Sequence, residues 1–511
     1  MNPRRAAHLT ARLSPAFALF LASVAAAVVL VLVLARKPAD PAAIPGAPVQ
    51  EPLLVFCAAG LKPPIEAIAR QFEQSEGLKI QLQYGGSQTL LANLAVSARG
   101  DLYIAAEDAY VQLARNKKLV REIIPLAQMR VALAVARDNP KKIATLADLL
   151  RPDVRVAQAN PDAAAVGKLT REALQKTGEW EPLRAHTTVF KPTVNDVAND
   201  LKLGSADAGF VWDATIRQYP ELAAVPIAVF SNLVAHVSAG VLTSSKQPAA
   251  ALRFARFLAA RDRGGKIFEQ HGFTPINGDP WAKIPEVRLL AGAMLRPAIE
   301  RTITEFEQRE GVRVTRVYNG CGILVAQMRA GDRPDGYFAC DQSFMKEVHD
   351  LFLDAADISG NQLVILVHKG NPRGVRALKD LAQPGLKLGV GHEKQCALGV
   401  LTGQTLDFIG LRNQVMKNVT VQSPTGDLLV NQLRTKSLDA VIAYISNAAG
   451  AGDDLEAIAV DLPCALATQP AAVGKEAKYP QLTERLFAAL RSAESKDRFV
   501  KLGFTWKGGG R

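Results

Sequence analysis

An internal duplication is the feature that most constrains the fold of this 511-residue chain. The segment LKPPIEAIARQFEQSEG at 61–77 returns as LRPAIERTITEFEQREG at 295–311. Phe72 and Phe306 are separated by 234 residues, and a later matched pair, Gly167 and Gly399, by 232. A solenoid repeat is only about 20 to 50 residues long, so two copies of this length indicate duplicated domains. We place them at 53–283 and 286–511.

Each copy alternates short apolar strands with amphipathic helices. In the first copy LLVFCAA at 53–59 precedes a helix expected from about Pro64 to Glu76, and LKIQLQY at 78–84 follows it. This order predicts an α/β fold with parallel strands and right-handed crossovers. A second set of units begins at 130–137, and the chain is expected to return to the first lobe near 237–242. Two lobes per domain follow from this pattern.

The N-terminal part predicts a membrane anchor. An uncharged apolar run at 16–35 is long enough to cross a bilayer, whereas the apolar region of a cleavable signal is usually about 7 to 15 residues. Removal of the segment as a signal peptide remains the alternative. Basic residues in 1–15 predict a cytoplasmic stub, and the Pro- and Ala-rich stretch at 36–52 a semi-rigid linker. We expect a single-pass protein of the inner (cytoplasmic) membrane with the bulk of the chain in the periplasm.

Composition argues against several functions. The formal net charge is +12, but Lys and Arg are scattered and aromatic residues make up only 6%, which does not favour nucleic-acid binding. The strand-to-helix turns hold no catalytic set, so we expect neither an enzyme nor a cofactor. Asp101 and Asp335 recur at the starts of strands and are expected to be structural caps. His392 lies on a turn, where solvation is favoured over metal ligation.

The cysteines give limited information. There are five, at positions 57, 321, 340, 396 and 464, so in an exported chain at least one is unpaired or pairs between chains. No C-x-x-C spacing or histidine run indicates zinc.

Ligand sites in open α/β sheets lie beyond the carboxyl ends of the strands, where helices begin. Four such turns in the first copy are AAGL at 58–61, GGS at 85–87, NPDAAAVG at 160–167 and PTVND at 192–196. They are small and rich in neutral residues, so an oxyanion could approach the free N–H groups of the following helices. The alternative is that these residues serve only as turns and N-caps.

Together with the runs YGGSQTL at 84–90, GDLYIAAED at 100–108 and GSADAGFVW at 204–212, these turns resemble the periplasmic molybdate-binding proteins of ABC importers. The resemblance covers about 53–280 and 287–507. It implies two tandem type II periplasmic-binding-protein domains behind an N-terminal transmembrane helix, each with two α/β lobes around a ligand cleft. It also implies a small oxyanion ligand, molybdate or tungstate, and separate ABC permease and ATPase partners.

In that family two serines, backbone amides and a tyrosine hydroxyl surround the anion. Residue-by-residue matching implies Gly60, Ser87, Val166, Val194 and Trp212 in the first copy. Only Ser87 keeps the family's side chain. Trp212 can still donate through its indole N–H, and Gly60 only through its backbone amide.

The matched positions in the second copy depart further from the family. They are Met294, Cys321, Leu398, Gly426 and Tyr444. Loss of a buried hydroxyl partner costs about 1 to 3 kcal/mol, so molybdate is less favoured there. Cys321 and Cys340 could form a disulfide, or the cysteines could simply be small buried residues. Alternatively, thiolates of Cys321, Cys340 and Cys396 could bind a soft metal or metalloid.

The sequence therefore predicts an extracytoplasmic solute-binding protein for an ABC importer. A membrane-tethered ligand sensor and soft-metal binding by the second domain remain alternatives. No G-x-x-x-x-G-K-[ST] motif is present, so an ATPase would be a separate subunit.

Overall fold

The computed structural model of the protein describes residues 51–449 and 454–508. The predicted stub, the predicted membrane segment and nearly all of the predicted linker lie outside the described residues. Within the described ranges, no helix is long and apolar enough to cross a membrane.

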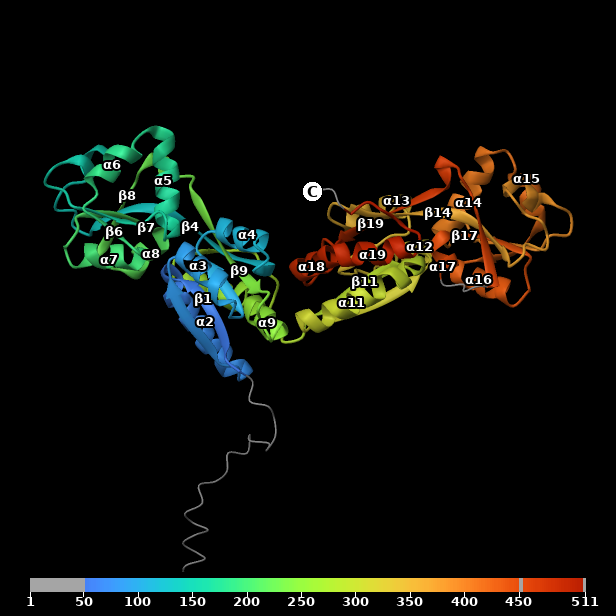
Figure 1. Ribbon diagram of the computed structural model, residues 1–511, viewed down its shortest axis with the longest axis horizontal. Coiled ribbons are helices and arrows are strands. Elements are labelled where there is room, and N and C mark those ends of the chain that lie inside the picture. Colours follow the sequence, from blue (N-terminus) through green and yellow to red (C-terminus); the bar gives the residue numbers. More distant parts are fainter. Residues whose placement is uncertain (1–50, 450–453, 509–511) are drawn as a thin grey trace, which may run out of the picture. The chain divides into compact units, whose positions relative to one another are not determined.

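The two repeats form tandem α/β domains with the same mixed sheet order (Figure 1). In the first domain the order is β2-β1-β3-β9-β4-β7-β5-β6, and in the second it is β12-β11-β13-β19-β14-β17-β15-β16. β1 (Leu53–Ala58) is parallel to β2 (Ile80–Gly85) and β3 (Leu102–Ala105), as the alternation of strands and helices predicts. In the second domain β11 (Glu286–Gly292) is likewise parallel to its neighbours.

One long strand runs through both lobes of each domain. β4 (Val120–Ala136) pairs with β9 (Val234–Leu242) through Arg130 and with β7 (Ala208–Trp212) from Val131 onward. β9 also pairs with β3, so the chain returns to the first lobe as expected. In the second domain β14 (Ala356–His368) pairs in the same way with β19 (Leu466–Val473) and β17 (Ala440–Tyr444).

The other elements fill the two lobes. In the first domain the remaining strands and the helices are β5 (Val156–Ala159), β6 (Val189–Lys191), β8 (Leu222–Val225), β10 (Thr274–Pro275), η1 (Ala59–Leu61), α2 (Lys62–Glu76), α3 (Ser87–Ser97), α4 (Asp108–Asn116), η2 (Ala147–Leu150), α5 (Ala165–Thr177), α6 (Trp180–His186), α7 (Val194–Lys202), α8 (Asp213–Gln218), η3 (Ala228–Phe230), α9 (Pro248–Ala259) and α10 (Gly264–Gln270). In the second domain they are β12 (Arg313–Asn319), β13 (Gly336–Phe338), β15 (Leu388–Gly391), β16 (Val419–Ser423), β18 (Leu455–Ala459), β20 (Thr505–Trp506), η4 (Ala293–Leu295), α11 (Arg296–Glu310), α12 (Cys321–Arg329), α13 (Gln342–Lys346), η5 (His349–Leu351), η6 (Leu378–Ala382), α14 (Ala397–Phe408), α15 (Arg412–Val415), η7 (Met416–Asn418), α16 (Gly426–Arg434), α17 (Ile445–Ala449), η9 (Pro463–Ala465), α18 (Pro480–Leu490) and α19 (Ala493–Lys501).

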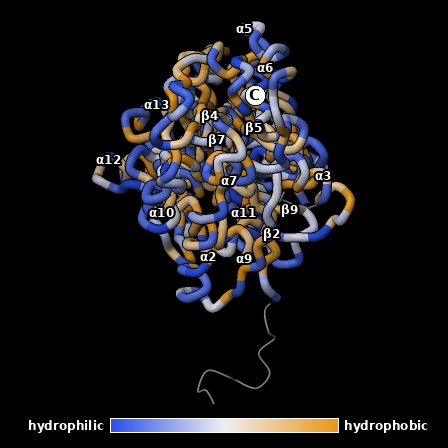
Figure 2. The backbone as a smooth tube through the Cα atoms, turned by 90° about the vertical axis from the view of Figure 1, so that its left-hand side faces the viewer, coloured by the Kyte–Doolittle hydropathy of each residue, from blue (hydrophilic) through white to orange (hydrophobic). Residues whose placement is uncertain are grey.

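Helix α2 shows how the repeat encodes its local structure. Its buried residues Ile65, Ile68 and Phe72 recur at helical spacing and face the sheet. Gly77 adopts a left-handed φ of 72° and ends the helix, as Gly311 does after α11 with 64°. In Figure 2 hydrophobic and hydrophilic stretches alternate along the backbone, as expected for amphipathic elements.

The repeated aspartates are structural caps, as predicted. Asp101 Oδ2 accepts from the Leu54 N–H at 2.9 Å, and Asp335 Oδ2 accepts from the Arg288 N–H at 2.8 Å. Each carboxylate ties the start of one strand to its neighbour, far from the strand-to-helix turns.

A buried ion-pair cluster lies where the two repeats are joined. Glu310, at the end of α11, is 2% exposed and contacts Arg256 of α9 at 3.0 Å and Arg485 of α18 at 2.8 Å. Burial alone would raise the pKa of the Glu310 carboxyl, but the two guanidinium groups lower it below its usual value. The carboxylate therefore stays ionised inside the protein.

Candidate ligand-binding clefts

All five positions predicted for the first domain line one cavity. It is small and lies where β1, β2, β5, β6 and β7 end. The lining residues are Ala58, Ala59, Gly60, Gly85, Gly86, Ser87, Ala106, Ala164, Ala165, Val166, Thr193, Val194 and Trp212. None of these thirteen carries a charged side chain.

The two lobes meet directly beside this cavity. The Gln88 N–H, in the first turn of α3, donates to the Ala163 carbonyl in the other lobe at 3.1 Å. A Cβ on Gly86 would collide with that same carbonyl and would lie 3.0 Å from the Pro192 carbonyl. The equivalent contact recurs in the second domain, where the Gly322 N–H donates to the Gln395 carbonyl at 3.0 Å. Both clefts are therefore closed, and a glycine is needed for the lobes to approach.

Ser87 is placed to act as a hydrogen-bond donor. It begins α3, is 1% exposed, and its Oγ accepts from the Ala106 N–H at 3.2 Å. Tyr103 donates to the Ser87 carbonyl at 2.6 Å and holds the turn. Because its Oγ already accepts a bond from Ala106, the Ser87 hydroxyl can direct its hydrogen to a ligand in the cavity.

Gly60 and Trp212 face each other across the cleft. A Cβ on Gly60 would lie 3.2 Å from Trp212 Nε1 and 2.9 Å from Val194 Cγ1. The tryptophan ring thus occupies the space that the side chain of the family's first serine would need. Its indole N–H brings a neutral donor to the same part of the cavity.

Two helix N-termini supply backbone donors from the second lobe. Val166 lies in the first turn of α5, and Val194 begins α7. Thr193 caps α7 through a reciprocal capping box with Asp196. N–H groups in a first helical turn have no intrahelical acceptor, and the helix dipole adds partial positive charge. The site can therefore hold an anion without a charged side chain.

The second domain forms a small cavity at the equivalent place. Its lining residues are Ala293, Met294, Asn319, Gly320, Cys340, Cys396, Ala397, Leu398, Pro424, Thr425, Gly426 and Tyr444. Four of the five predicted positions are among them. The fifth, Cys321, is 0% exposed and is bonded to the lining residue Cys340.

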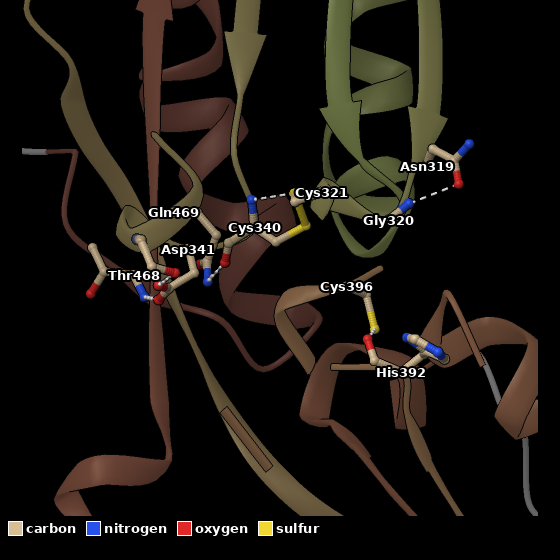
Figure 3. Close-up of a disulfide and its surroundings, with 10 residues drawn as sticks. Asn319, Gly320, Cys321, Cys340, Asp341, His392, Cys396, Thr468 and Gln469 are labelled. Atoms are coloured by element: carbon tan, nitrogen blue, oxygen red, sulfur yellow. Dashed lines mark hydrogen bonds between the residues drawn. A yellow bond between two sulfur atoms is a disulfide. The ribbon is translucent and has the colours of Figure 1, made fainter. Parts of the chain in front are cut away.

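Cys321 and Cys340 form a disulfide (Figure 3), with Cα atoms 6.2 Å apart. The Cys321 sulfur takes the place that the Ser87 hydroxyl has in the first cleft, and the backbone hydrogen bond to that atom is kept. The Cys340 N–H donates to Cys321 Sγ at 3.0 Å, just as the Ala106 N–H donates to Ser87 Oγ. The structure therefore has the predicted disulfide alternative. Cys57, Cys396 and Cys464 are free, in keeping with the odd cysteine count.

The alternative of three converging thiolates does not match this arrangement, because two of the three sulfurs are bonded to each other. The Cys396 thiol points toward carbonyls of its own lobe, those of His392 at 3.6 Å and Ser423 at 3.5 Å. In the part of the chain that the structure describes, no group of three His, Cys, Asp or Glu side chains is placed to hold a metal ion. His392 instead accepts through Nδ1 from the Lys394 N–H.

Tyr444 lines the second cavity together with two other polar residues, Asn319 and Thr425. It is buried, and its hydroxyl has no hydrogen-bond partner among the described residues. Burial raises the pKa of the Tyr444 hydroxyl well above its ordinary value, so it stays protonated. Gly426 is required beside it, since a Cβ there would collide with the Asn447 amide.

The GGS turn predicted from the sequence includes Gly86, and the repeat spacing pairs Ala106 with Cys340. Sequence matching did not single out Asn447. Asn447 gave no signal, because its contact with Gly426 depends on packing between separate elements.

Comparison with known proteins decides the family. The model for bacterial extracellular solute-binding proteins matches residues 53–274 and again 287–505. The chain belongs to this family. A putative binding protein of Haemophilus influenzae is 29% identical over 226 residues, covering 44% of this chain and 91% of its own length. Molybdate-binding protein ModA of Mycobacterium tuberculosis is 30% identical over 247 residues, covering 46% of this chain and 89% of its own.

Solved structures include the periplasmic molybdate-binding protein of Azotobacter vinelandii, which is 19% identical with a TM-score of 0.39. That comparison covers 43% of this solute-binding protein and 98% of the other chain. The sulfate-binding protein SubI of Mycobacterium tuberculosis is 18% identical with a TM-score of 0.40, and the match covers 53% and 94%. Both of the curated relatives, from Haemophilus influenzae and Mycobacterium tuberculosis, are named as binding proteins.

Proposed function

We propose that this solute-binding protein captures a small tetrahedral oxyanion of the molybdate or tungstate kind in its first cleft. It then delivers the anion to the permease and ATPase of an ABC importer. The similarity to molybdate-binding relatives supports this assignment, and the first cleft keeps a serine, Ser87, that the resemblance implies.

The observation that carries the proposal is the donor set around the first cavity. Ser87, Trp212, Gly60, Val166 and Val194 line one cavity that has no charged side chain, and each of them carries a neutral donor. Several fixed neutral donors can hold a buried dianion, while a buried counter-charge would itself cost desolvation. A cationic ligand would leave these donors without acceptors.

The location of the protein is part of the same proposal. Residues 16–35 act as an uncleaved membrane anchor, and the linker at 36–52 holds the two binding domains in the periplasm near the permease. The first binding domain would end at about residue 283 and the second would begin at about residue 286. The importer would then meet the two domains as a tandem pair.

The test is a calorimetric titration of the chain with molybdate, tungstate, sulfate and phosphate. We expect one oxyanion to bind with a stoichiometry near one, because only the first cleft offers the full donor set. Tyr444→Phe serves as the matched control, since it removes a hydroxyl from the second cleft only and should leave the titration unchanged. Absence of binding by all four anions, or loss of binding in Tyr444→Phe, would overturn the proposal.

A further inference from the structure

The second cleft has lost the features that suit an oxyanion and gained a reactive bond in their place. Met294 stands where Gly60 stands in the first cleft, and the Cys321–Cys340 disulfide stands in place of Ser87 and Ala106. Of the three side-chain positions of the family's site, only Tyr444 can donate a hydrogen bond. This wall of the cavity therefore presents sulfur rather than hydroxyl groups.

The two sulfurs of the disulfide are not equivalent. Cys340 lines the cavity, whereas Cys321 is fully buried behind it and its Sγ accepts from the Cys340 N–H at 3.0 Å. Cys321 is also the first residue of the nine-residue helix α12. A helix N-terminus and an amide donor both stabilise a thiolate. The geometry therefore makes Cys340 the sulfur open to attack and Cys321 the better leaving group.

The opposite wall is built to hold a small anionic group. The helices α14, of twelve residues, and α16, of nine, begin at this cavity and bring Leu398 and Gly426 to its surface. N–H groups in their first turns suit a carboxylate, as do those of α5 and α7 in the first domain. The buried Tyr444 hydroxyl, which lacks a partner among the described residues, is an independent sign that a ligand completes the site.

We propose that the second cleft is a thiol–disulfide exchange site for a small thiol that carries a carboxylate. The cavity is small and lies between two closed lobes, so a small molecule can enter it only when the lobes open, and a protein thiol cannot be enclosed there. The carboxylate binds at the N-termini of α14 and α16, and the sulfur faces Cys340.

The exchange step needs no further oxidant. The small thiol loses its proton to solvent, and its thiolate sulfur forms a bond to Cys340 Sγ as the Cys340–Cys321 bond breaks. Cys321 leaves as a thiolate carrying the electron pair. The products are a mixed disulfide on Cys340 and a reduced Cys321, so one sulfur of the ligand is oxidised while one cysteine of the protein is reduced.

The test compares two probes on the unreduced full chain at equal thiolate concentration. These are 3-mercaptopropionate, which has a carboxylate, and 2-mercaptoethanol, which does not. Samples are quenched with acid, labelled with N-ethylmaleimide and mapped by peptide mass spectrometry. We expect the mixed disulfide on Cys340, the maleimide label on Cys321, and a rate about 5-fold higher for the carboxylate thiol, from a favourable interaction of about 1 kcal/mol at helix N-termini.

Two variants sharpen the result. Tyr444→Phe should reduce the rate with 3-mercaptopropionate more than the rate with 2-mercaptoethanol. Cys321→Ser should leave a Cys340 thiol that forms a stable mixed disulfide with the symmetrical disulfide of the probe.

Equal rates for the two thiols, or attack on Cys321 instead of Cys340, would overturn the inference. Because the comparison of the two thiols uses the unmodified protein, failure of a variant to fold leaves the test intact, and oxyanion binding by the first cleft is a separate measurement.

Discussion

Trp212 Nε1 lies 3.2 Å from the point where a Cβ on Gly60 would stand, so the two residues form one complementary pair across the first cleft. Gly60 belongs to the turn after β1 and Trp212 ends β7, in the other lobe. Closure of the lobes brings the indole into the space that glycine leaves free. In the second domain the two equivalent positions hold Met294 and Tyr444. Met294 is larger than Gly60, and the Tyr444 ring is smaller than the Trp212 indole.

This relationship predicts that Gly60→Ser weakens ligand binding, although it restores the serine of the family. The new Cβ would press on Val194 and Trp212, and overpacking of this kind costs about 1 to 3 kcal/mol. Since the contact exists only in the closed state, affinity for the bound oxyanion should fall by roughly 5- to 150-fold. The double variant Gly60→Ser, Trp212→Tyr should recover part of that loss in calorimetry. A single variant that binds as well as the parent would contradict the pairing.

Ser87→Ala tests the hydroxyl donor alone. Loss of a hydrogen bond to a charged ligand is expected to lower the affinity by about 1 to 3 kcal/mol. The fold should persist, because the Ser87 carbonyl that anchors Tyr103 is retained. Thermal unfolding of the ligand-free protein gives the control. If affinity is unchanged, the hydroxyl is not a ligand.

Gly86→Ala tests closure. Its Cβ would collide with the Ala163 carbonyl, which belongs to the opposite lobe, so the substitution should hinder the closed state more than the fold of either lobe. We expect weaker oxyanion binding with little change in the melting temperature of the ligand-free protein. Gly320→Ala makes the same change in the second domain and should leave binding by the first cleft unaltered. Equal losses in both variants would argue against a local effect.

Much of this arrangement could be predicted from the sequence, because it follows from local pattern. The duplication, the α/β order and the turns that bear Gly60, Ser87, Val166, Val194 and Trp212 are all readable from spacing. Contacts between lobes are not, because they depend on how separate elements pack. The fit of Trp212 over Gly60 joins residues 152 positions apart. The spacing of the repeats left the disulfide and the soft-metal site as open alternatives, because it does not say how close Cys321 and Cys340 lie. The positions of β13 and α12 in the fold bring the two cysteines together.

The burial of Glu310 was also invisible in the sequence, where an acidic residue before a terminal glycine is typical of a solvated helix end. Breaking a buried pair by removing one partner typically costs about 3 to 5 kcal/mol, so Glu310→Gln should be strongly destabilising. The pairing lowers the pKa of the carboxyl below its usual 4.5. Its stabilisation is therefore complete above about pH 4.5 and is lost as the pH falls through the lowered value.

The control for Glu310→Gln lies on the same helix. Glu305 pairs with Arg498 at 2.7 Å but remains 46% exposed, and such surface pairs contribute little. Denaturant unfolding between pH 3 and pH 7 should show a large loss of stability and a shallower acid dependence for Glu310→Gln, with Glu305→Gln close to the parent. Similar curves for both variants would show that the buried cluster does not hold the repeats together. The second domain expressed from residue 286 lacks Arg256 but retains Arg485, so it should keep only part of this acid-dependent stabilisation.

The two repeats also allow the disulfide to be moved from one cleft to the other. The double variant Ser87→Cys, Ala106→Cys places cysteines at the positions of Cys321 and Cys340, where the amide-to-side-chain bond is 3.2 Å in the first domain and 3.0 Å in the second. This shared geometry predicts that a disulfide forms in the first cleft. Oxyanion affinity should fall in the oxidised protein by about 1 to 3 kcal/mol, as in Ser87→Ala, because the bonded sulfur has no hydrogen to donate, and it should return in part after reduction to thiols. Calorimetry before and after reduction provides the measurement, with Ser87→Cys alone as the control for the thiol. An oxidised double variant that still binds the anion as the parent does would show that the donor at position 87 is dispensable, and that the disulfide of the second cleft does not by itself exclude an oxyanion.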